Sequence, residues 1–471
     1  MLATANSSNQ GPRLGGQDVD SNYQRFAFRL CYYFLIILFI IPILLCYTAV
    51  ACPSYTYPPA HYSALRLRVS RSEHPGRGNI HNEKVFIAAS LYDPTGELAR
   101  GAWGSSIVQL ITLLGEENVF LSIYENEIKD KDESGRRRDT DKKSRGRLAL
   151  AELSDRIPCN KSIVYESLDL DQLPSVTIPT TGENHVKRIT YLAETRNRAL
   201  RPLENDSDND EMAMTVTTRF DKLLFLNDVA FDPIDALQLL FSTNADSNGI
   251  TQYRAACAVD FINPAKFYDT YATRDQEGYS MGLPFFPWFS TAGSGRSRQA
   301  VLAGSDSVPV RSCWGGMVSF DARYFQNGSS LVPAAAGGLP ARFRALTDPD
   351  YSWDASECCL IHADIQRPRN DDGSSTELEA GVYMNPFVRV AYDRTTLSWL
   401  STTRRIERLY SGVQRIGSYL IGLPWFNPRR EDQVGGSDGF CGRRGRGLQV
   451  VVPRREGKKG WQTIPVARDM A

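Results

Sequence analysis

The chain has 471 residues, and its 54 Lys and Arg are balanced by 54 Asp and Glu, so the formal net charge is zero. Hydrophobic residues make up 42% and charged residues 23%, which is the balance of a globular protein and not of a disordered or collagen-like chain. The absence of a basic excess excludes a uniformly basic nucleic-acid-binding protein, and we expect no nucleic-acid partner.

Residues 30–51 form an apolar segment without Asp, Glu, Lys or Arg. A helix of this length rises about 33 Å, enough to cross the ~30 Å hydrocarbon core of a bilayer. A cleaved signal peptide fits less well, because its apolar run would be shorter and would begin nearer the N-terminus. Arg25 and Arg29 precede the segment, whereas residues 52–65 carry no Asp, Glu, Lys or Arg. The sequence therefore predicts one signal-anchor helix, with a cytoplasmic tail at 1–29 and the remainder in the lumen.

This single-pass (type II) plan is typical of Golgi-resident enzymes. In the oxidising lumen we expect some cysteines to form disulfides, but their spacing does not tell which ones pair. The cysteines beyond the anchor and its edge are Cys159, Cys257, Cys313, Cys358, Cys359 and Cys441. Three glycosylation sequons, at Asn160, Asn205 and Asn327, also follow the anchor.

The luminal sequence begins with a Pro-, Tyr- and Arg-rich stretch at 52–83, which we interpret as a stem. A catalytic domain is expected over 84–426. At its start the patterns of residues 84–91, 103–114 and 118–124 predict a strand, a helix and a second strand, which is the βαβ signature of a parallel sheet. The almost wholly polar segment 125–147 is predicted to be a charged loop insertion.

Residues 222–229 read as a buried strand, and 231–241 as a helix with Asp232 as N-cap and Pro233 at its first position. The tail at 427–471 is basic and Gly-rich, and we expect it to be disordered. The other predicted elements are a helix within 187–203, strands within 250–261 and 387–393, a strand and a Gly-Gly turn within 308–325, a strand or short helix at 355–365, and a mainly helical stretch at 397–423.

Asn227 and Asp228 end the strand at 222–229. In open parallel sheets ligands bind at the carboxyl ends of the strands, and a carboxylate there can hold a divalent cation against a diphosphate. We therefore predict that Asp228 is a metal ligand and catalytic residue and that Asn227 contacts the bound ligand. The alternative is a polar strand end followed by a helix cap.

Three further groups of residues are candidates for a binding site. On the helix of 187–203, Arg196 and Asn197 would be free to contact a phosphate or nucleotide, although an ordinary solvated helix face explains them nearly as well. Trp314 offers a flat face for a sugar, and Gly315-Gly316 allows a close backbone approach to a ligand; the alternative is a structural turn with a core tryptophan.

The last group is Glu357 and His362, and His362 follows the apolar run that separates the two residues. Together with nearby carboxylates, His362 could complete a metal site. A single histidine is more often a structural residue, and that alternative stays open.

Eight segments of the chain together resemble the fungal capsule-associated α-1,3-mannosyltransferase family (glycosyltransferase family 69, of the cryptococcal mannosyltransferase type). These segments are FIAASLYD, LLGEENVFLSIYE, RITYLAETRNRALRPL, FDKLLFLNDVAF, YRAACAVDF, YDTYATRD, PVRSCWGGMVSFDA and ASECCLIHADI. The resemblance covers residues 84–364 and continues weakly to about residue 426.

The resemblance implies an α/β, GT-A-like fold with a mostly parallel central sheet. It also implies a Golgi enzyme that moves mannose from GDP-mannose to an α-mannoside with retention, using Mn²⁺ or Mg²⁺. By analogy with other GT-A enzymes, Asn227 and Asp228 stand where those enzymes carry the DxD motif. The first acidic residue of that motif is replaced by Asn227 here. The same analogy gives His362 the role of a late metal ligand and Glu357 that of an acidic residue at the sugar or acceptor.

Three other functions stay open at this point. A glycosidase would need two carboxylates across a cleft and no nucleotide. A non-catalytic luminal factor for polysaccharide assembly or export would need no donor site. A glycosyltransferase could also use a different nucleotide sugar.

Overall fold

The computed structural model divides the chain into two units, Met1–Pro53 and Ser54–Ala471. It describes residues 17–126, 140–178, 181–204, 218–327, 339–346, 353–366, 381–425, 440–444, 447–452 and 460–465.

The first unit contains helix α1 (Gln17–Ala51). Its part from Arg25 to Ala51 is long and apolar enough to cross a membrane. The predicted anchor at 30–51 thus lies inside one continuous helix. Pro42 does not interrupt this helix, as membrane helices can accommodate proline.

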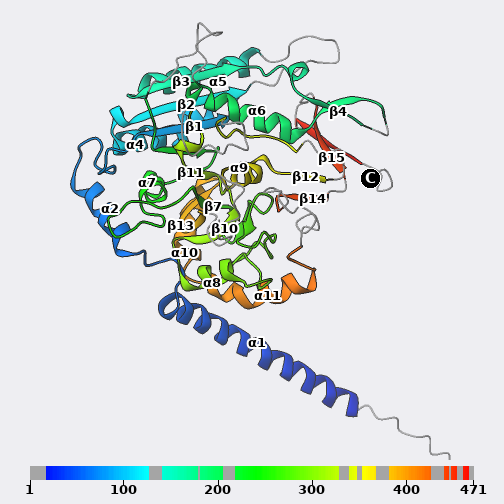
Figure 1. Ribbon diagram of the computed structural model, residues 1–471. Helices are drawn as coiled ribbons and strands as arrows, with labels where there is room; N and C mark the ends of the chain where they lie inside the picture. The colour runs from blue at the N-terminus through cyan, green and yellow to red at the C-terminus, as the bar shows by residue number, and fades with distance from the viewer. Residues whose placement is uncertain are drawn as a thin grey trace, which may run out of the picture. The chain divides into compact units, whose positions relative to one another are not determined.

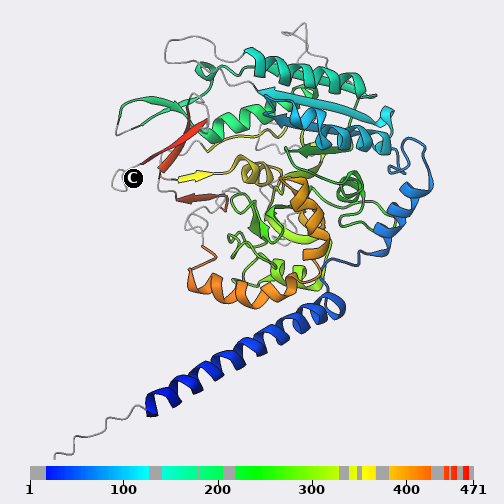
Figure 2. The same ribbon diagram turned by 180° about the vertical axis from the view of Figure 1, so that it is seen from behind.

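The second unit is built on one ten-stranded sheet (Figures 1 and 2). Its strands lie in the order β3-β2-β1-β6-β11-β7-β13-β10-β9, and β8 pairs with β7. Within this order, β10 and β11 are antiparallel to the other strands, which are parallel to one another. The strands are β1 (Val85–Leu91), β2 (Val119–Asn126), β3 (Asn160–Glu166), β6 (Lys222–Leu226), β7 (Ala255–Asn263), β8 (Lys266–Phe267), β9 (Arg274–Asp275), β10 (Val308–Ser312), β11 (Met317–Asp321) and β13 (Val382–Ala391).

Helices cover both faces of this sheet because its central strands bury side chains in both directions. In β1, Val85 and Ile87 face one hydrophobic cluster, and Phe86 and Ala88 face another. The first cluster includes α2 (Ala60–Arg71), α4 (Ala102–Leu114), α5 (Thr140–Arg156) and α7 (Pro233–Phe241); the second includes α6 (Arg188–Leu200) and α9 (Glu357–Gln366). The predicted α/β class with a mostly parallel central sheet is confirmed.

The elements predicted from local sequence signals in the first part of the domain are also confirmed. Strand β1, helix α4 and the parallel strand β2 follow one another as predicted, and α4 stops at Gly115, whose φ is 90°. Helix α7 starts as expected, with the Asp232 carboxylate accepting from the backbone N–H of Ile234 and Pro233 in first position.

Smaller elements surround the sheet. They are α3 (Glu97–Arg100), α8 (Arg296–Ala303), α10 (Arg394–Thr403), α11 (Tyr410–Leu420), β4 (Ser175–Thr177), β5 (Asn184–Val186), β12 (Trp353–Ala355), β14 (Gly442–Arg444), β15 (Gly447–Val451) and β16 (Trp461–Pro465). The segment at 355–365, for which strand and helix both stood open, is mainly the helix α9.

The structure corrects three predicted boundaries. Part of the expected stem at 52–83 is α2, whose Tyr62, Leu65 and Val69 are buried in the domain. The insertion at 125–147 begins inside β2 and ends inside α5, and its residues 127–139 lie outside the described part of the chain. The tail at 427–471 contains β14, β15 and β16, so it is not disordered there.

Candidate active site

Polar residues from several elements meet where β6, β7 and β13 end. Because β7 and β13 are parallel neighbours, with Asp260 opposite Val390, their ends lie side by side. The residues that line this edge are Asn227 and Asp228 after β6, Asp260 on β7, Asp269 in the loop after it, Gly315 and Gly316 before β11, Tyr392 after β13, Arg196 on α6 and Glu357 on α9.

Asp228 stands on a loop whose backbone is fixed at the preceding residue, Asn227. The Asn227 N–H donates to the Gly316 carbonyl at 2.9 Å, and the Trp103 indole N–H donates to the Asn227 carbonyl at 2.9 Å. Asp228 itself reaches solvent. Desolvation by the surrounding protein still raises its pKa, and the positive charge of Arg196 opposes that rise. The structure therefore places an accessible carboxylate within the field of a buried cation.

Arg196 forms a buried ion pair with Glu357, with 2.5 Å between Nη1 and Oε1. The two residues are 8% and 2% exposed. The guanidinium also lies over the ring of Trp314, 5.0 Å from its centroid. Desolvation lowers the pKa of Arg196, but Cys358, Glu357 and other acidic neighbours more than offset this and raise it overall. Arg196 is thus a permanent positive charge beside Asp228.

The site also contains a pair of carboxylates, Asp260 and Asp269, that the sequence did not predict. The backbone N–H of Asp269 donates to Asp260 Oδ1 at 3.0 Å, and the Tyr392 hydroxyl donates to Asp260 Oδ2 at 3.2 Å. Asp269 itself accepts from the backbone N–H groups of Ala272 and Gly315. Burial raises the pKa of both carboxyls, and the charge of Asp269 raises that of Asp260 further.

This acidic pair belongs to the same site as Asp228. After desolvation, the charges of Asp260, Asp269 and Asp228 are the main factors that raise the pKa of the Tyr392 hydroxyl. The available signal was the rule that pointed to Asp228: Asp260 lies near the end of a buried strand, and Asp269 follows it in the segment YDTYATRD.

The geometry of the Trp314-Gly315-Gly316 turn fits the alternative of a structural turn with a core tryptophan. Trp314 is only 4% exposed and packs against Phe225 and Phe343, so it has no free face for a sugar. A Cβ on Gly315 would lie 1.9 Å from the Ala258 carbonyl oxygen. Gly315 is thus required because the turn passes close to β7, and a Cβ on Gly316 would lie 2.7 Å from Val229 Cγ1.

Asn197 was predicted to contact a nucleotide, but its amide is already used. Its Nδ2 donates to the Phe343 carbonyl and its Oδ1 accepts from the Phe343 N–H, each at 2.9 Å. Asn197 therefore holds the backbone that carries Phe343 beside Arg196.

His362 lies in the core rather than at the sheet edge. It is 0% exposed, its Nδ1 is 2.7 Å from the Cys358 carbonyl oxygen, and its Nε2 is 3.8 Å from the Cys257 sulfur. Burial lowers its pKa to about 4. Both ring nitrogens thus face fixed neighbours, and we do not retain His362 as a metal ligand.

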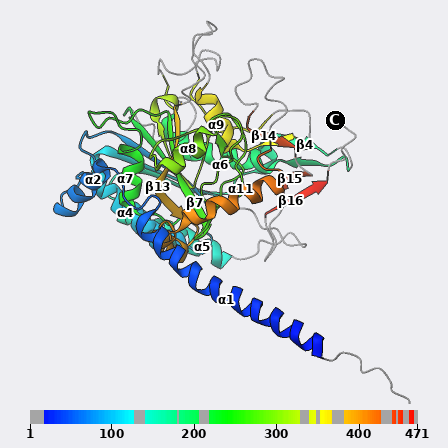
Figure 3. The same ribbon diagram turned by 90° about the horizontal axis from the view of Figure 1, so that it is seen from below.

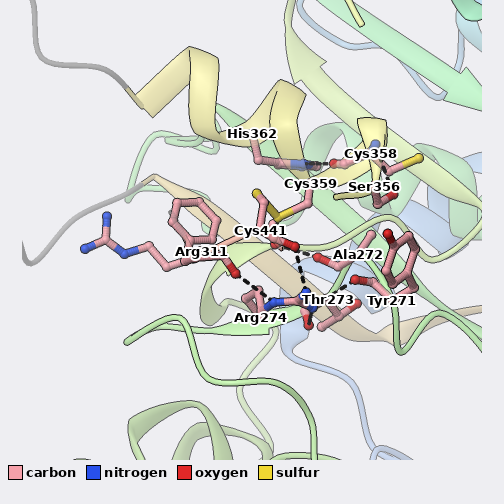
Figure 4. Close-up of a disulfide and its surroundings, with 12 residues drawn as sticks. Tyr271, Ala272, Thr273, Arg274, Arg311, Ser356, Cys358, Cys359, His362 and Cys441 are labelled. Atoms are coloured by element: carbon pink, nitrogen blue, oxygen red, sulfur yellow. Dashed lines mark hydrogen bonds between the residues drawn. A yellow bond between two sulfur atoms is a disulfide. The ribbon is translucent and has the colours of Figure 1, made fainter. Parts of the chain in front are cut away.

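Two disulfides brace the site. Cys257–Cys313 joins β7 to the turn before Trp314, and Cys359–Cys441 joins α9 to the C-terminal segment. Figure 4 shows Arg274 beside the second disulfide, where its guanidinium donates to the carbonyls of Phe440 and Cys441. The second disulfide fixes α9, and with it Glu357, to the C-terminal segment.

Of the candidate metal-binding side chains, Asp228 suits a divalent cation. Among the described residues, the cluster with three metal-binding side chains is Cys257, Cys313 and His362, and its two sulfurs are bonded to each other. At the sheet edge Asp228 is the accessible carboxylate. Mg²⁺ is commonly held by one or two carboxylates together with substrate phosphates, and an accessible Asp228 suits that arrangement.

Two of the solved structures that match the chain have low similarity to it. The mannosyltransferase PcManGT from Pyrobaculum calidifontis, solved with GDP-Man and Mn²⁺, is 13% identical, with 81% of this chain and 75% of that chain covered and a TM-score of 0.32. Glucosyl-3-phosphoglycerate synthase from Mycobacterium tuberculosis, solved with Mn²⁺, UDP and glucosyl-3-phosphoglycerate, is 11% identical, with 88% and 94% covered and a TM-score of 0.31. At these TM-scores neither match decides anything about this chain.

The family comparison is decisive. No curated protein matches the sequence. The sequence model of the family described as "Cryptococcal mannosyltransferase 1" matches residues 84–364, which is more than half of the 471-residue chain and includes all the site residues except Tyr392. The chain belongs to this mannosyltransferase family.

Proposed function

We propose that this glycosyltransferase moves mannose from GDP-mannose to an α-mannoside in α-1,3 linkage, with retention and with Mn²⁺ or Mg²⁺. We further propose that it works in the Golgi lumen, anchored by α1 as a type II membrane protein. The observation that supports the site most directly is the accessible carboxylate of Asp228 beside the buried cation Arg196.

The residues at the sheet edge suit a reaction in which a diphosphate leaves. As the bond between the sugar and the diphosphate breaks, negative charge grows on the leaving oxygen. Arg196, held on the face of Trp314, would oppose that charge without having to reorganise. A divalent cation held by Asp228 would supply Lewis-acid stabilisation of the same charge. Asn227 lies beside Asp228 and would contact the donor.

Glu357 has a positioning role in this proposal. It is 2% exposed and bonded to Arg196, so it aims the guanidinium instead of meeting the acceptor sugar directly. Asp269, which is partly exposed, is proposed to face the transferred sugar or the acceptor at the same edge, and the buried Asp260, which accepts from the Asp269 N–H and the Tyr392 hydroxyl, would position it.

The test is a panel of nucleotide sugars given to the purified full-length chain in detergent, with α-mannobiose as acceptor and with or without a chelator. We expect transfer from GDP-mannose that requires metal, and an α-1,3 product by NMR. Asp228→Asn should lower kcat by about 10²-fold or more. The matched control is Asp155→Asn, an exposed aspartate on α5.

Normal transfer by Asp228→Asn with an unchanged metal requirement would refute the assignment of the metal site. Stabilisation by GDP without transfer would favour the non-catalytic luminal factor. Transfer from another donor would keep the site but replace GDP-mannose.

A further inference from the structure

Helix α11 buries its polar face and exposes its apolar face, which is the reverse of the pattern usual for a helix of a water-soluble protein. Its buried residues are polar: Gln414 and Ser418 are 1% and 4% exposed. Gln414 accepts from the buried guanidinium of Arg298 at 2.6 Å, and the Ser418 hydroxyl accepts from the Leu283 N–H at 2.9 Å. Hydrogen bonds from Gln414 and Ser418, together with packing of Tyr410 at its start, therefore fix this helix to the domain.

The outer face of α11 and the residue after it is apolar. Val413, Ile416, Leu420 and Ile421 are 72%, 64%, 74% and 61% exposed, and Tyr419 beside them is also exposed. Positions 413, 416 and 420 recur at helical spacing, so they form one stripe. Figure 3 shows α11 running along the outside of the domain. An exposed contiguous apolar stripe of this kind marks an interaction surface.

The charge around the stripe is positive. Residues 394–421 contain five arginines and a single acid, Glu407. Glu407 is buried in an ion pair with Arg389, 2.7 Å apart, so it does not offset the outer charge. Arg405 and Arg415 are exposed on either side of the start of α11. Apolar side chains flanked by arginines suit the boundary between lipid headgroups and acyl chains.

The chain itself brings this face close to a membrane. The segment able to cross a bilayer ends at Ala51, and the domain begins at Ser54. The Ser54 N–H donates to the Arg404 carbonyl at 3.1 Å, and the Arg404 guanidinium donates to the Tyr55 carbonyl at 3.2 Å. Arg404 immediately follows α10 on the segment that leads to α11. The surface that carries α11 is therefore tethered within a few residues of the end of the anchor.

We infer that α11 docks on the lipid bilayer, with Val413, Ile416 and Leu420 inserted below the headgroups and the neighbouring arginines at the phosphates. The domain would then be held at the membrane at two places, the anchor and α11. This inference uses the membrane anchor of the proposed function but not its catalytic activity.

The experiment reconstitutes the full chain in phosphatidylcholine nanodiscs that contain a lipid with a diazirine on its acyl chain. After illumination, peptide mass spectrometry locates the lipid adducts. We expect adducts on the peptide that contains residues 410–421. The triple variant Val413→Ser/Ile416→Ser/Leu420→Ser should lose them at least tenfold. A control variant, Leu148→Ser/Val164→Ser, changes exposed apolar residues on α5 and β3 and should keep them.

Adducts on α1 report correct insertion in every sample, and thermal unfolding reports whether each variant is folded. An inserted wild-type chain without adducts on 410–421 would overturn the inference, as would equal adducts in a folded triple variant. Crosslinks between two copies of the chain through α11 would overturn it in favour of a dimer interface. Mannose transfer is measured separately, so loss of activity and loss of lipid contact are distinguishable.

Discussion

The ion pair between Arg196 and Glu357 gives the sharpest test of the site, because both its members are almost completely buried. We consider Glu357→Gln, which removes the negative charge but keeps the shape and one acceptor oxygen. The Arg196 guanidinium then stays buried with a neutral partner. Removing one member of a buried pair typically costs about 3–5 kcal/mol. Since the glutamine oxygen can still accept from Nη1, we expect about 3 kcal/mol.

A double-mutant cycle separates the pair from its surroundings. Arg196→Met leaves the Glu357 carboxylate buried without its partner and should cost a similar amount. The double variant removes both charges, so its cost should fall below the sum of the two single costs by roughly 2 kcal/mol. The quantity measured is the free energy of unfolding of the full chain in detergent, from urea titration followed by tryptophan fluorescence.

The exposed pair Arg100–Glu152 serves as the control, with 2.7 Å between Nε and Oε2. Glu152→Gln should leave the free energy of unfolding almost unchanged, because solvent screens an exposed pair. Additive costs for the two buried substitutions would refute the reasoning, since the two charges would then not compensate each other. A mannose-transfer rate in Glu357→Gln equal to that of the wild type would refute the positioning role of Glu357.

Three further predictions concern the framework of the site. His362 has a folded-state pKa of about 4, below its ordinary 6.5, so the stability that its neutral ring contributes is complete above pH 6.5 and is lost as the pH falls toward 4. His362→Gln should therefore reduce the loss of unfolding free energy between pH 7 and pH 4.5 by roughly 2–3 kcal/mol, measured by urea titration at both pH values. Gly315→Ala should prevent normal folding, because a Cβ there would meet the Ala258 carbonyl, whereas Gly304→Ala, with a positive φ but open space, should cost only about 1–2 kcal/mol by thermal unfolding. Cys441→Ser breaks the Cys359–Cys441 disulfide, which closes a sequence separation of 82 residues, and should cost about 3–4 kcal/mol by thermal unfolding under oxidising conditions.

The sequence predicted those elements whose signals are local. An apolar run followed by a glycine with positive φ was enough for α4 and Gly115, and a capping aspartate before a proline was enough for α7. The C-terminal tail has no such signal. Its first strand, β14, pairs with β12, and Cys441 beside it is bonded to Cys359. These partners are distant in sequence, so composition alone predicted disorder.

The sequence predicted the site residue whose position depends on the end of a single strand. It did not predict the residues that depend on two segments of the chain meeting. Asp228 follows β6 directly. The Asp260–Asp269 pair depends on the chain turning back after β7, so that the Asp269 N–H reaches the Asp260 carboxylate. His362 shows the opposite error. Its spacing from Glu357 suggested a shared site, but α9 turns its ring inward toward Cys257 and Phe320.

Helix α11 shows a limit of periodicity that applies to any amphipathic segment. The pattern at 397–423 predicted helix correctly, and the usual interpretation would place the apolar stripe inward. The surface beneath α11 is polar, however, since Arg298 and the carbonyls of Trp288 and Phe289 need partners there, and Gln414 supplies them. Burying the polar stripe satisfies these groups and turns the apolar stripe outward. A hydrophobic stripe therefore predicts that a helix has an apolar neighbour, but whether this neighbour is protein or lipid depends on what the opposite stripe can bind.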